Sequence, residues 1–170
     1  ACNLARHSSQ FEAERSHTRM NDFMTTWWKV PVPAGWQTER TRDFLRLTRS
    51  GTSPSEARIY FSHKPYALAS DADIEGFAQS HRESTVQRTA VTFGILSGIR
   101  LSGADDPTQR RLKWCLIHKH MVVEAFLEGK TDDIADIEDV LQHLQLTEEG
   151  KTCANNTSED IVAKRAESSR

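Results

Sequence analysis

The sequence predicts an α+β fold in which helices flank an antiparallel β-sheet. Two observations carry this prediction: short runs of β-branched and aromatic residues alternate with turn sequences, and two longer segments place apolar residues at helical spacing. The order along the chain is strands, helix, several strands and a closing helix, which is typical of helices that cover an antiparallel sheet. At 170 residues the chain has room for one domain with tails.

Strand patterns dominate the chain before the first helix. The run at 27–32 is rich in aromatic and β-branched residues, and Pro31 and Pro33 indicate a strand end or a sheet edge because proline cannot donate to a ladder. Gly35 favours a turn just before Trp36. Further strands are predicted at 36–41, 44–49 and 57–61, with a loop at 50–54.

Two helices are predicted from apolar stripes. Ser70 is a candidate N-cap for a helix over 70–84, because the acidic residues after it favour the positive end of the helix dipole. The closing helix is predicted over 132–145. The stripes comprise Ile74, Phe77, Ala78 and His81 in the first helix, and Ile134, Ile137, Leu141 and Leu144 in the second.

The segment between these helices predicts antiparallel hairpins. A turn sequence at 102–107 separates two pairs of strand-like runs, and the residues 118–120 are the predicted tip of the second hairpin. The predicted strands are 90–96, 99–102, 112–117 and 121–127.

The run Trp28-Lys29-Val30-Pro31-Val32-Pro33-Ala34-Gly35-Trp36 resembles the strand, proline, glycine and tryptophan opening of the Mog1/PsbP-like family of α/β/α sandwiches. The resemblance covers residues 23–147 and extends to the order and length of the later elements. It implies a sandwich domain whose role is binding, with no catalytic signature to carry over. Bacterial members are often envelope lipoproteins or secretion-system accessory proteins.

Composition divides the chain into three parts. Residues 1–22 are polar and predict a tether, residues 23–147 predict the sandwich domain, and residues 148–170 predict a polar, mobile tail.

Ala1-Cys2 fits the last positions of a bacterial lipoprotein signal, whose cysteine receives the lipid. We therefore expect Cys2 to be acylated and the protein to sit on the periplasmic side of the cell envelope, anchored to the outer membrane. The alternative is an ordinary cysteine near the end of a secreted or cytosolic fragment. Cys115 and Cys153 leave two possibilities open, a disulfide in an oxidising periplasm or a buried free thiol at Cys115.

Basic residues gather in two places and suggest a docking surface for a protein partner. Arginine binds carboxylates in pairs, and an exposed tryptophan is a common interface anchor. The alternative for the arginines is a solvated strand face. The net charge of -2 argues against a nucleic-acid binder. The candidate partner-binding residues are Trp27, Arg40, Arg42, Arg46, Arg49, Arg110 and Arg111.

The sequence offers weak signals for chemistry. His118 and His120 are two apart at a predicted hairpin tip and are the best candidates for a metal, although no third ligand is evident, so we expect no cofactor. The acidic residues Asp132 and Asp133 are explained by the dipole of the closing helix. Since nucleophile, phosphate-loop and dinucleotide motifs are missing from the sequence, we expect no enzymatic activity.

These observations lead to one principal hypothesis and two alternatives. The principal hypothesis is a non-enzymatic envelope lipoprotein that binds a protein partner, most concretely an immunity protein that neutralises a secreted, type VI-like effector enzyme in the periplasm. The first alternative is an accessory lipoprotein of a secretion or envelope-assembly system. The second is a periplasmic protein that binds a small molecule or a metal.

Overall fold

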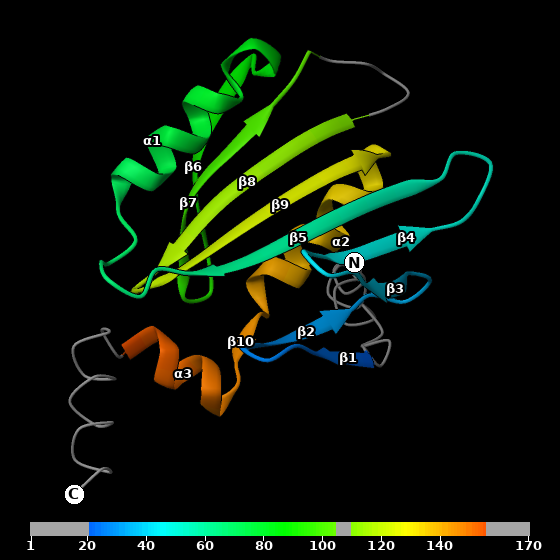
Figure 1. Ribbon diagram of the computed structural model, residues 1–170. Coiled ribbons are helices and arrows are strands. Elements are labelled where there is room, and N and C mark those ends of the chain that lie inside the picture. Colours follow the sequence, from blue (N-terminus) through cyan, green and yellow to red (C-terminus); the bar gives the residue numbers. More distant parts are fainter. Residues whose placement is uncertain (1–20, 105–109, 156–170) are drawn as a thin grey trace, which may run out of the picture.

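The computed structural model describes residues 21–104 and 110–155 (Figure 1). The strands are β1 (Asn21–Met24), β2 (Trp28–Val32), β3 (Gln37–Arg40), β4 (Leu45–Arg49), β5 (Ser55–His63), β6 (Gln87–Phe93), β7 (Leu96–Ser102), β8 (Arg110–His118), β9 (Met121–Gly129) and β10 (Gln145–Leu146). The helices are α1 (Asp71–Ser80), the short 3-10 helix η1 (Arg82–Ser84), α2 (Thr131–Gln142) and α3 (Glu148–Asn155). None of the helices in these described residues is long and apolar enough to cross a membrane.

The strands form two antiparallel sheets. The large sheet has seven strands in the order β3-β4-β5-β9-β8-β7-β6, and β1, β2 and β10 form a separate three-stranded sheet. The central ladder of the large sheet is long, because β5 pairs with β9 from Glu56↔Glu128 to His63↔Met121. The predicted fold class, an antiparallel sheet flanked by helices, is confirmed.

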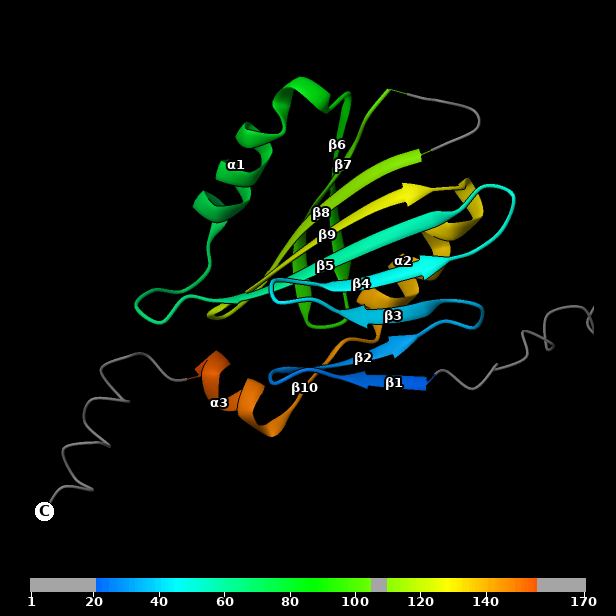
Figure 2. The same cartoon turned by 45° about the vertical axis from the view of Figure 1, so that its right-hand side comes forward.

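The large sheet carries elements on both faces (Figures 1 and 2). On one face α2 contacts β9, β6 and β2, so the sheet curls around this helix and the small sheet lies beside it. On the other face α1 packs against β8 and β7. The result is a sandwich whose main core lies between the large sheet, α2 and the small sheet.

Strand alternation divides the apolar residues between two clusters. The main core is centred on Trp28 and Trp114, both fully buried. It also holds the buried face of α2, where Ile137 and Leu141 fall on the predicted stripe. The second cluster lies beneath α1 and is smaller. It comprises Ile74, Phe77, Ile99, Leu101, Cys115 and Val122.

The cap predicted for the first helix is present. Ser70 has extended dihedral angles just before α1, and its backbone N–H donates to Asp73 Oδ2 at 2.9 Å. The predicted hairpin tip is also confirmed, since β8 ends at His118 and β9 begins at Met121. Lys119 between them has a φ of 52°, which a two-residue hairpin turn requires.

The two described cysteines are free thiols on opposite sides of the large sheet. Cys115 belongs to the cluster beneath α1, while Cys153 on α3 packs against the main core. The sheet between them excludes the disulfide that the sequence left open. Burial raises the pKa of the Cys115 thiol to about 12, helped by the charges of Glu124 and Asp73, so this thiol stays protonated.

The folded domain extends beyond the predicted 23–147. β1 begins at Asn21, and α3 occupies the start of the segment that was predicted to be a mobile tail. Ala154 of this helix is 1% exposed within the main core. The segment is polar because only one narrow side of α3 is buried, and this composition concealed the helix. Residues 156–170 of the predicted tail, and 1–20 of the predicted tether, lie outside the described residues.

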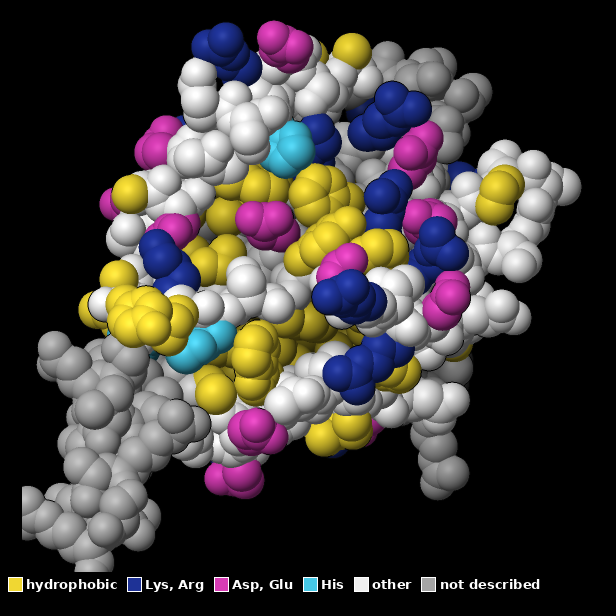
Figure 3. Space-filling view, viewed as in Figure 1, with side chains coloured by type: hydrophobic (Ala, Val, Ile, Leu, Met, Phe, Trp, Pro, Cys, Tyr) yellow, Lys and Arg dark blue, Asp and Glu magenta, His cyan; other side chains and the backbone are white. Residues whose placement is uncertain are grey.

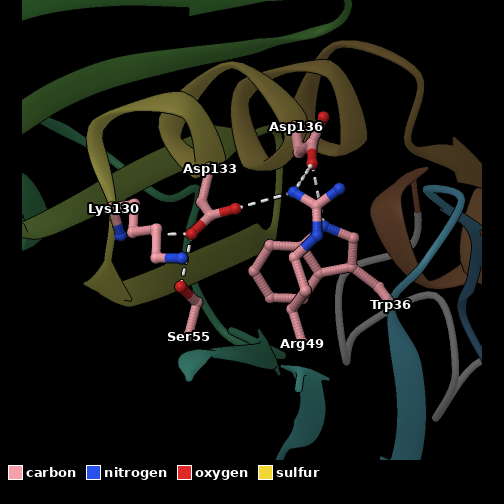
Figure 4. A network of polar contacts seen from close by, with 6 residues as sticks. All are labelled: Trp36, Arg49, Ser55, Lys130, Asp133 and Asp136. Carbon is pink, nitrogen blue, oxygen red and sulfur yellow. Dashed lines mark hydrogen bonds and ion pairs between the residues drawn. The ribbon is translucent and has the colours of Figure 1, made fainter. Parts of the chain in front are cut away.

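A partly buried polar network attaches the start of α2 to β4 and β5 (Figure 4). The backbone N–H of Lys130 donates to Asp133 Oδ2 at 3.1 Å, and Ser55 Oγ donates to the same oxygen. Arg49 Nη1 lies 2.7 Å from Asp133 Oδ1 and 2.9 Å from Asp136 Oδ2. Asp133, one of the two carboxylates predicted to act on the helix dipole, therefore also binds the sheet, whereas Asp132 is exposed.

The ionised form of Asp133 is favoured by this network. Burial would raise its pKa, but hydrogen bonds from Ser55, Arg49 and the Lys130 backbone outweigh that effect and hold the pKa below its ordinary value. The Trp36 indole N–H donates to Asp136 Oδ2 at 2.9 Å, and the Arg49 guanidinium lies 5.7 Å from the centre of the Trp36 ring. The Pro-x-Gly-Trp turn is thereby joined to α2.

Replacement of Gly150 by alanine should loosen the docking of α3. A Cβ at this position would lie 2.1 Å from the Trp27 carbonyl oxygen, so we expect Gly150→Ala to lower the free energy of unfolding by about 1–3 kcal/mol. The control is Gly76→Ala in α1, where a Cβ meets nothing within 4 Å and where alanine should stabilise by about 0.5–1 kcal/mol. Urea denaturation measures both, and a neutral Gly150→Ala would contradict the close packing of α3.

Removal of the Asp133 charge should weaken the attachment of α2. We expect Asp133→Asn to lower the free energy of unfolding at neutral pH by about 2–4 kcal/mol, whereas the exposed Asp132→Asn should change it by less than about 1 kcal/mol. The stabilisation by ionised Asp133 is complete above its ordinary pKa of 3.8 and is lost as the pH falls below it through the folded pKa. Denaturation across pH should therefore show the two proteins converging in acid; a constant difference would contradict this.

Candidate binding face

Part of the large sheet has no helix over it. α1 covers β7 and β8, and the neighbouring strands β9, β5 and β4 on the same face are left open (Figures 1 and 3). Figure 3 shows hydrophobic side chains exposed over the middle of this face, with Lys, Arg, Asp and Glu side chains gathered beside them. We call this surface the open face.

A continuous row of rings crosses the open face from the turn before β4 to α1. The ring centroids of Phe44 and Tyr60 lie 5.1 Å apart, and Tyr60 and Phe126 form a T-shaped pair at 5.6 Å. Phe126 lies 6.0 Å from Phe77 and 5.6 Å from His81. Such spacings are those of favourable aromatic pairs. Phe44, Tyr60 and Phe126 are all half-buried, so each ring presents an edge or a face to the outside.

One side of this aromatic row borders a groove between α1 and β5. The groove has a volume of about 400 Å³. Its floor is formed by Ser62, Val122 and Glu124 from the sheet, and its wall by Phe77 and the neighbouring residues of α1. At one end Lys64 Nζ forms an ion pair with Asp73 Oδ1 at 2.5 Å.

Glu124 is the exceptional group of this groove. Its neighbours across the sheet are Tyr60 on β5 and Cys115 on β8, neither of which is a cation. Among the residues described, Glu124 accepts no hydrogen bond and forms no ion pair. Burial raises its pKa above the ordinary value of a glutamate.

The other side of the aromatic row borders a wider hollow of about 730 Å³ with charged walls. Here the charges are paired: Arg58 lies 2.9 Å from Glu56, and Arg111 lies 3.1 Å from Glu128. Lys113 donates to Ser84 Oγ at 2.7 Å, and its Nζ lies 3.2 Å from His81 Nδ1. Burial, followed by the charge of Arg111, lowers the pKa of Lys113.

Three of the predicted partner-binding residues come together. Trp27, Arg40 and Arg42 line a hollow of about 270 Å³, and Phe44 lines it with them. Since Phe44 also begins the aromatic row, this hollow continues the open face around the turn between β3 and β4. Trp28 is fully buried, whereas Trp27 lies in the bend before β2 and is half-buried against the main core.

The other predicted arginines are separated and engaged within the molecule. Arg46 on the open face pairs with Glu39 at 3.2 Å and with Glu56 at 3.5 Å. Arg49 points to the opposite face, where it binds α2. Arg111 pairs with Glu128, and Arg110 lies half-buried at the start of β8. Arg46 and Arg49, which were predicted to share one docking surface, thus lie on opposite faces of the sheet.

The two histidines proposed as weak metal ligands point to different parts of the chain. His118 Nδ1 lies 3.0 Å from the Ile95 carbonyl oxygen at the β6–β7 turn. His120 is buried, with Nδ1 2.8 Å from the Ala67 oxygen and 3.1 Å from the Lys64 oxygen. Within the ranges that the structure describes, no group of three or more His, Cys, Asp or Glu side chains is placed to hold a metal ion.

Sequence reasoning missed the aromatic row and Glu124. The strand pattern placed Tyr60 and Phe126 in strands but did not show that they share the face opposite the main core. The signal was present in the alternation of β9, where Val122, Glu124 and Phe126 interrupt the positions of the main core. Only the pairing of β5 with β9 brings Tyr60 beside them.

Comparisons with known proteins concern the fold. No family model matches the chain, and no curated protein matches it in sequence. A crystal structure of a protein from Bacteroides thetaiotaomicron VPI-5482 matches with a TM-score of 0.52 and 14% identity over 76% of this chain, which spans about half (49%) of that protein. The solution structure of cyanobacterial PsbP (CyanoP) from Synechocystis sp. PCC 6803 matches with a TM-score of 0.49 and 10% identity, covering 75% of this chain and 92% of that one.

The sandwich of the Mog1/PsbP-like kind, expected from the resemblance at residues 28–36, is confirmed as a fold by the strand order and layers described above. At these identities the likeness is one of fold, and it assigns no activity.

Proposed function

We propose that this protein is a non-enzymatic binding protein whose open face receives a protein partner. The observation that carries the proposal is the aromatic row on a sheet face that α1 leaves open. Half-buried aromatic rings are typical centres of protein interfaces, because they bury a large area at a small cost in side-chain entropy.

The surroundings of the row support a protein rather than a small ligand. Hollows of about 730, 400 and 270 Å³ lie along the row, and they are open grooves rather than one enclosed cavity. Paired charges such as Arg58 with Glu56 border the rings. An apolar centre with a polar rim is the usual organisation of a protein interface.

The buried serine and carboxylate beneath α2 support a structural role in place of catalysis. Asp133 is bound by Arg49 and has a lowered pKa, which makes it a poor general base. Ser55 donates to Asp133, and no histidine among the described residues is hydrogen-bonded to it. Both side chains are buried and hold α2 to the sheet.

The narrower form of the proposal places this binding protein in the bacterial envelope through a lipid on Cys2. There it acts as an immunity protein, whose open face covers a secreted effector enzyme that enters the periplasm. An accessory lipoprotein of a secretion or assembly system would use the same face, and the identity of the partner separates the two roles.

Substitution of the aromatic row should abolish capture of the partner. We expect one stoichiometric protein to co-purify with the wild type from its own cells, and at least tenfold less of it with Tyr60→Ala or Phe126→Ala. The matched control is Tyr66→Ala, whose side chain is 83% exposed outside the row. A secreted enzyme as partner supports immunity, and components of a machine support the accessory role.

Equal recovery of the partner with both row variants, verified as folded by thermal denaturation, would place the interface elsewhere on the molecule. Recovery of no partner from any variant would contradict protein binding itself.

Substitution of the candidate lipid acceptor tests the envelope anchor. If Cys2 carries a lipid, Cys2→Ser in the full-length precursor should move the protein from the membrane fraction to the soluble periplasm, because the substitution removes the acyl group that holds it at the membrane. Fractionation followed by immunoblotting measures the distribution, with Cys153→Ser as the control cysteine. An unchanged membrane fraction would contradict acylation at this position.

A further inference from the structure

We infer that the partner inserts a lysine or arginine side chain into the groove between α1 and β5, where it pairs with Glu124. This inference rests on the proposed function and adds to it the chemistry of the partner segment. The sequence led us to expect that arginines of this protein bind carboxylates of a partner, whereas here a carboxylate of this protein binds a cation of the partner.

Glu124 stands apart from the other carboxylates. In the ranges 21–104 and 110–155, every other carboxylate that is buried or half-buried has a cationic partner. Glu56 pairs with Arg46 and Arg58, Asp73 with Lys64, and Glu128 with Arg111. Asp133 and Asp136 both pair with Arg49, and Glu138 pairs with Arg100. The fold thus neutralises its partly buried acids throughout, with Glu124 as the exception.

The cations nearest to Glu124 are already engaged. Lys64 reaches across the groove to Asp73, and Lys113 on the adjacent strand donates to Ser84 and contacts His81. His81 meets Phe77 and Phe126 in T-shaped contacts, and burial followed by the charge of Lys113 lowers its pKa, which favours its neutral form. A cation that pairs with Glu124 must therefore come from outside this part of the chain.

The surroundings of Glu124 make its free state unfavourable. Val122 and Phe126 flank it along β9, and Tyr60 and Cys115 flank it across the sheet. Removing a carboxylate from water without a partner is costly, and this is the reason that burial raises its pKa. A bound cation would offset that cost.

The groove suits a long basic side chain. Its open volume of about 400 Å³ leaves room for a long side chain to lie in it. Phe77 lies in its wall and Phe126 at its edge, and ring faces attract ammonium and guanidinium groups. Since the groove borders the aromatic row, apolar residues on either side of the inserted cation would lie on the rings.

The first test uses the isotopically labelled full chain and a blocked pentapeptide of sequence Ala-Leu-Lys-Leu-Ala. We expect millimolar peptide to shift the side-chain carboxyl resonance of Glu124 and the amides of β9, and Glu124→Gln to weaken binding at least tenfold. The matched control is Glu128→Gln, which removes a carboxylate from the same strand and face but one that is paired with Arg111.

Two further probes test whether binding needs the positive charge of the lysine and whether a small free amine can replace the peptide. The same pentapeptide with norleucine in place of lysine should bind at least tenfold more weakly, because it keeps the methylene groups and loses the cation. Butylammonium should bind weakly; if it shifts Glu124 as strongly as the lysine peptide does, the site is one for small amines and the assignment to a protein partner is overturned. No shift of Glu124 with the lysine peptide also overturns the inference.

A measurement without any ligand tests whether Glu124 is unpaired in the folded protein. Glu124→Gln should raise Tm at pH 7 by about 2–4 °C, because it removes an unpaired, half-buried charge, whereas Glu128→Gln should not raise it. A fall in Tm for Glu124→Gln would mean that the carboxylate is already satisfied in the folded protein.

Capture from cells separates this inference from the proposed function. If Tyr60→Ala loses the partner and Glu124→Gln retains it fully, the open face is the interface and the cation is not inserted at Glu124. If neither variant loses the partner, the proposed function fails as well. Loss with both variants, together with a basic residue of the partner crosslinked to the groove, supports both.

Discussion

The two faces of one long antiparallel sheet determine most of this structure. Side chains alternate between the two faces along β5, β8 and β9, so each of these strands places apolar side chains on both faces of the sheet. The chain covers one face fully with α2, the small sheet and α3, and it covers the other only over β7 and β8 with α1. The main core and the open face are consequences of the same alternation, since Ile59 points into one and Tyr60 into the other.

Polar contacts at the start of α2 fix this helix to the covered face of the sheet. Asp133 enters a buried position at the start of the helix, where Ser55 and Arg49 satisfy it from β5 and β4. Because Arg49 lies on the α2 side of the sheet, its charge serves the fold and is directed away from the open face. The helix is therefore oriented by directional bonds as well as by its apolar stripe.

On the open face, most charged side chains form ion pairs that link neighbouring strands. Glu39, Arg46, Glu56 and Arg58 form a chain of ion pairs over β3, β4 and β5, which leaves this part of the surface nearly neutral and well hydrated. The aromatic rings of this face contact one another, whereas Glu124 has no cationic partner among the described residues. Burying the half-buried rings further is favourable, whereas removing water from the carboxylate is favourable only if a cation pairs with it.

Local patterns in the sequence determined the elements of this protein, and long-range pairing determined how they are used. The strand runs, the stripe of α2, the cap at Ser70 and the hairpin tip at 118–120 depend on neighbours a few residues apart, so sequence alone was enough. The short strand β10, the polar helix α3 and the separation of Cys115 from Cys153 depend on contacts across the whole chain. The same holds for the binding face: whether an arginine meets a carboxylate or water is decided by strand register, which only the tertiary structure supplies.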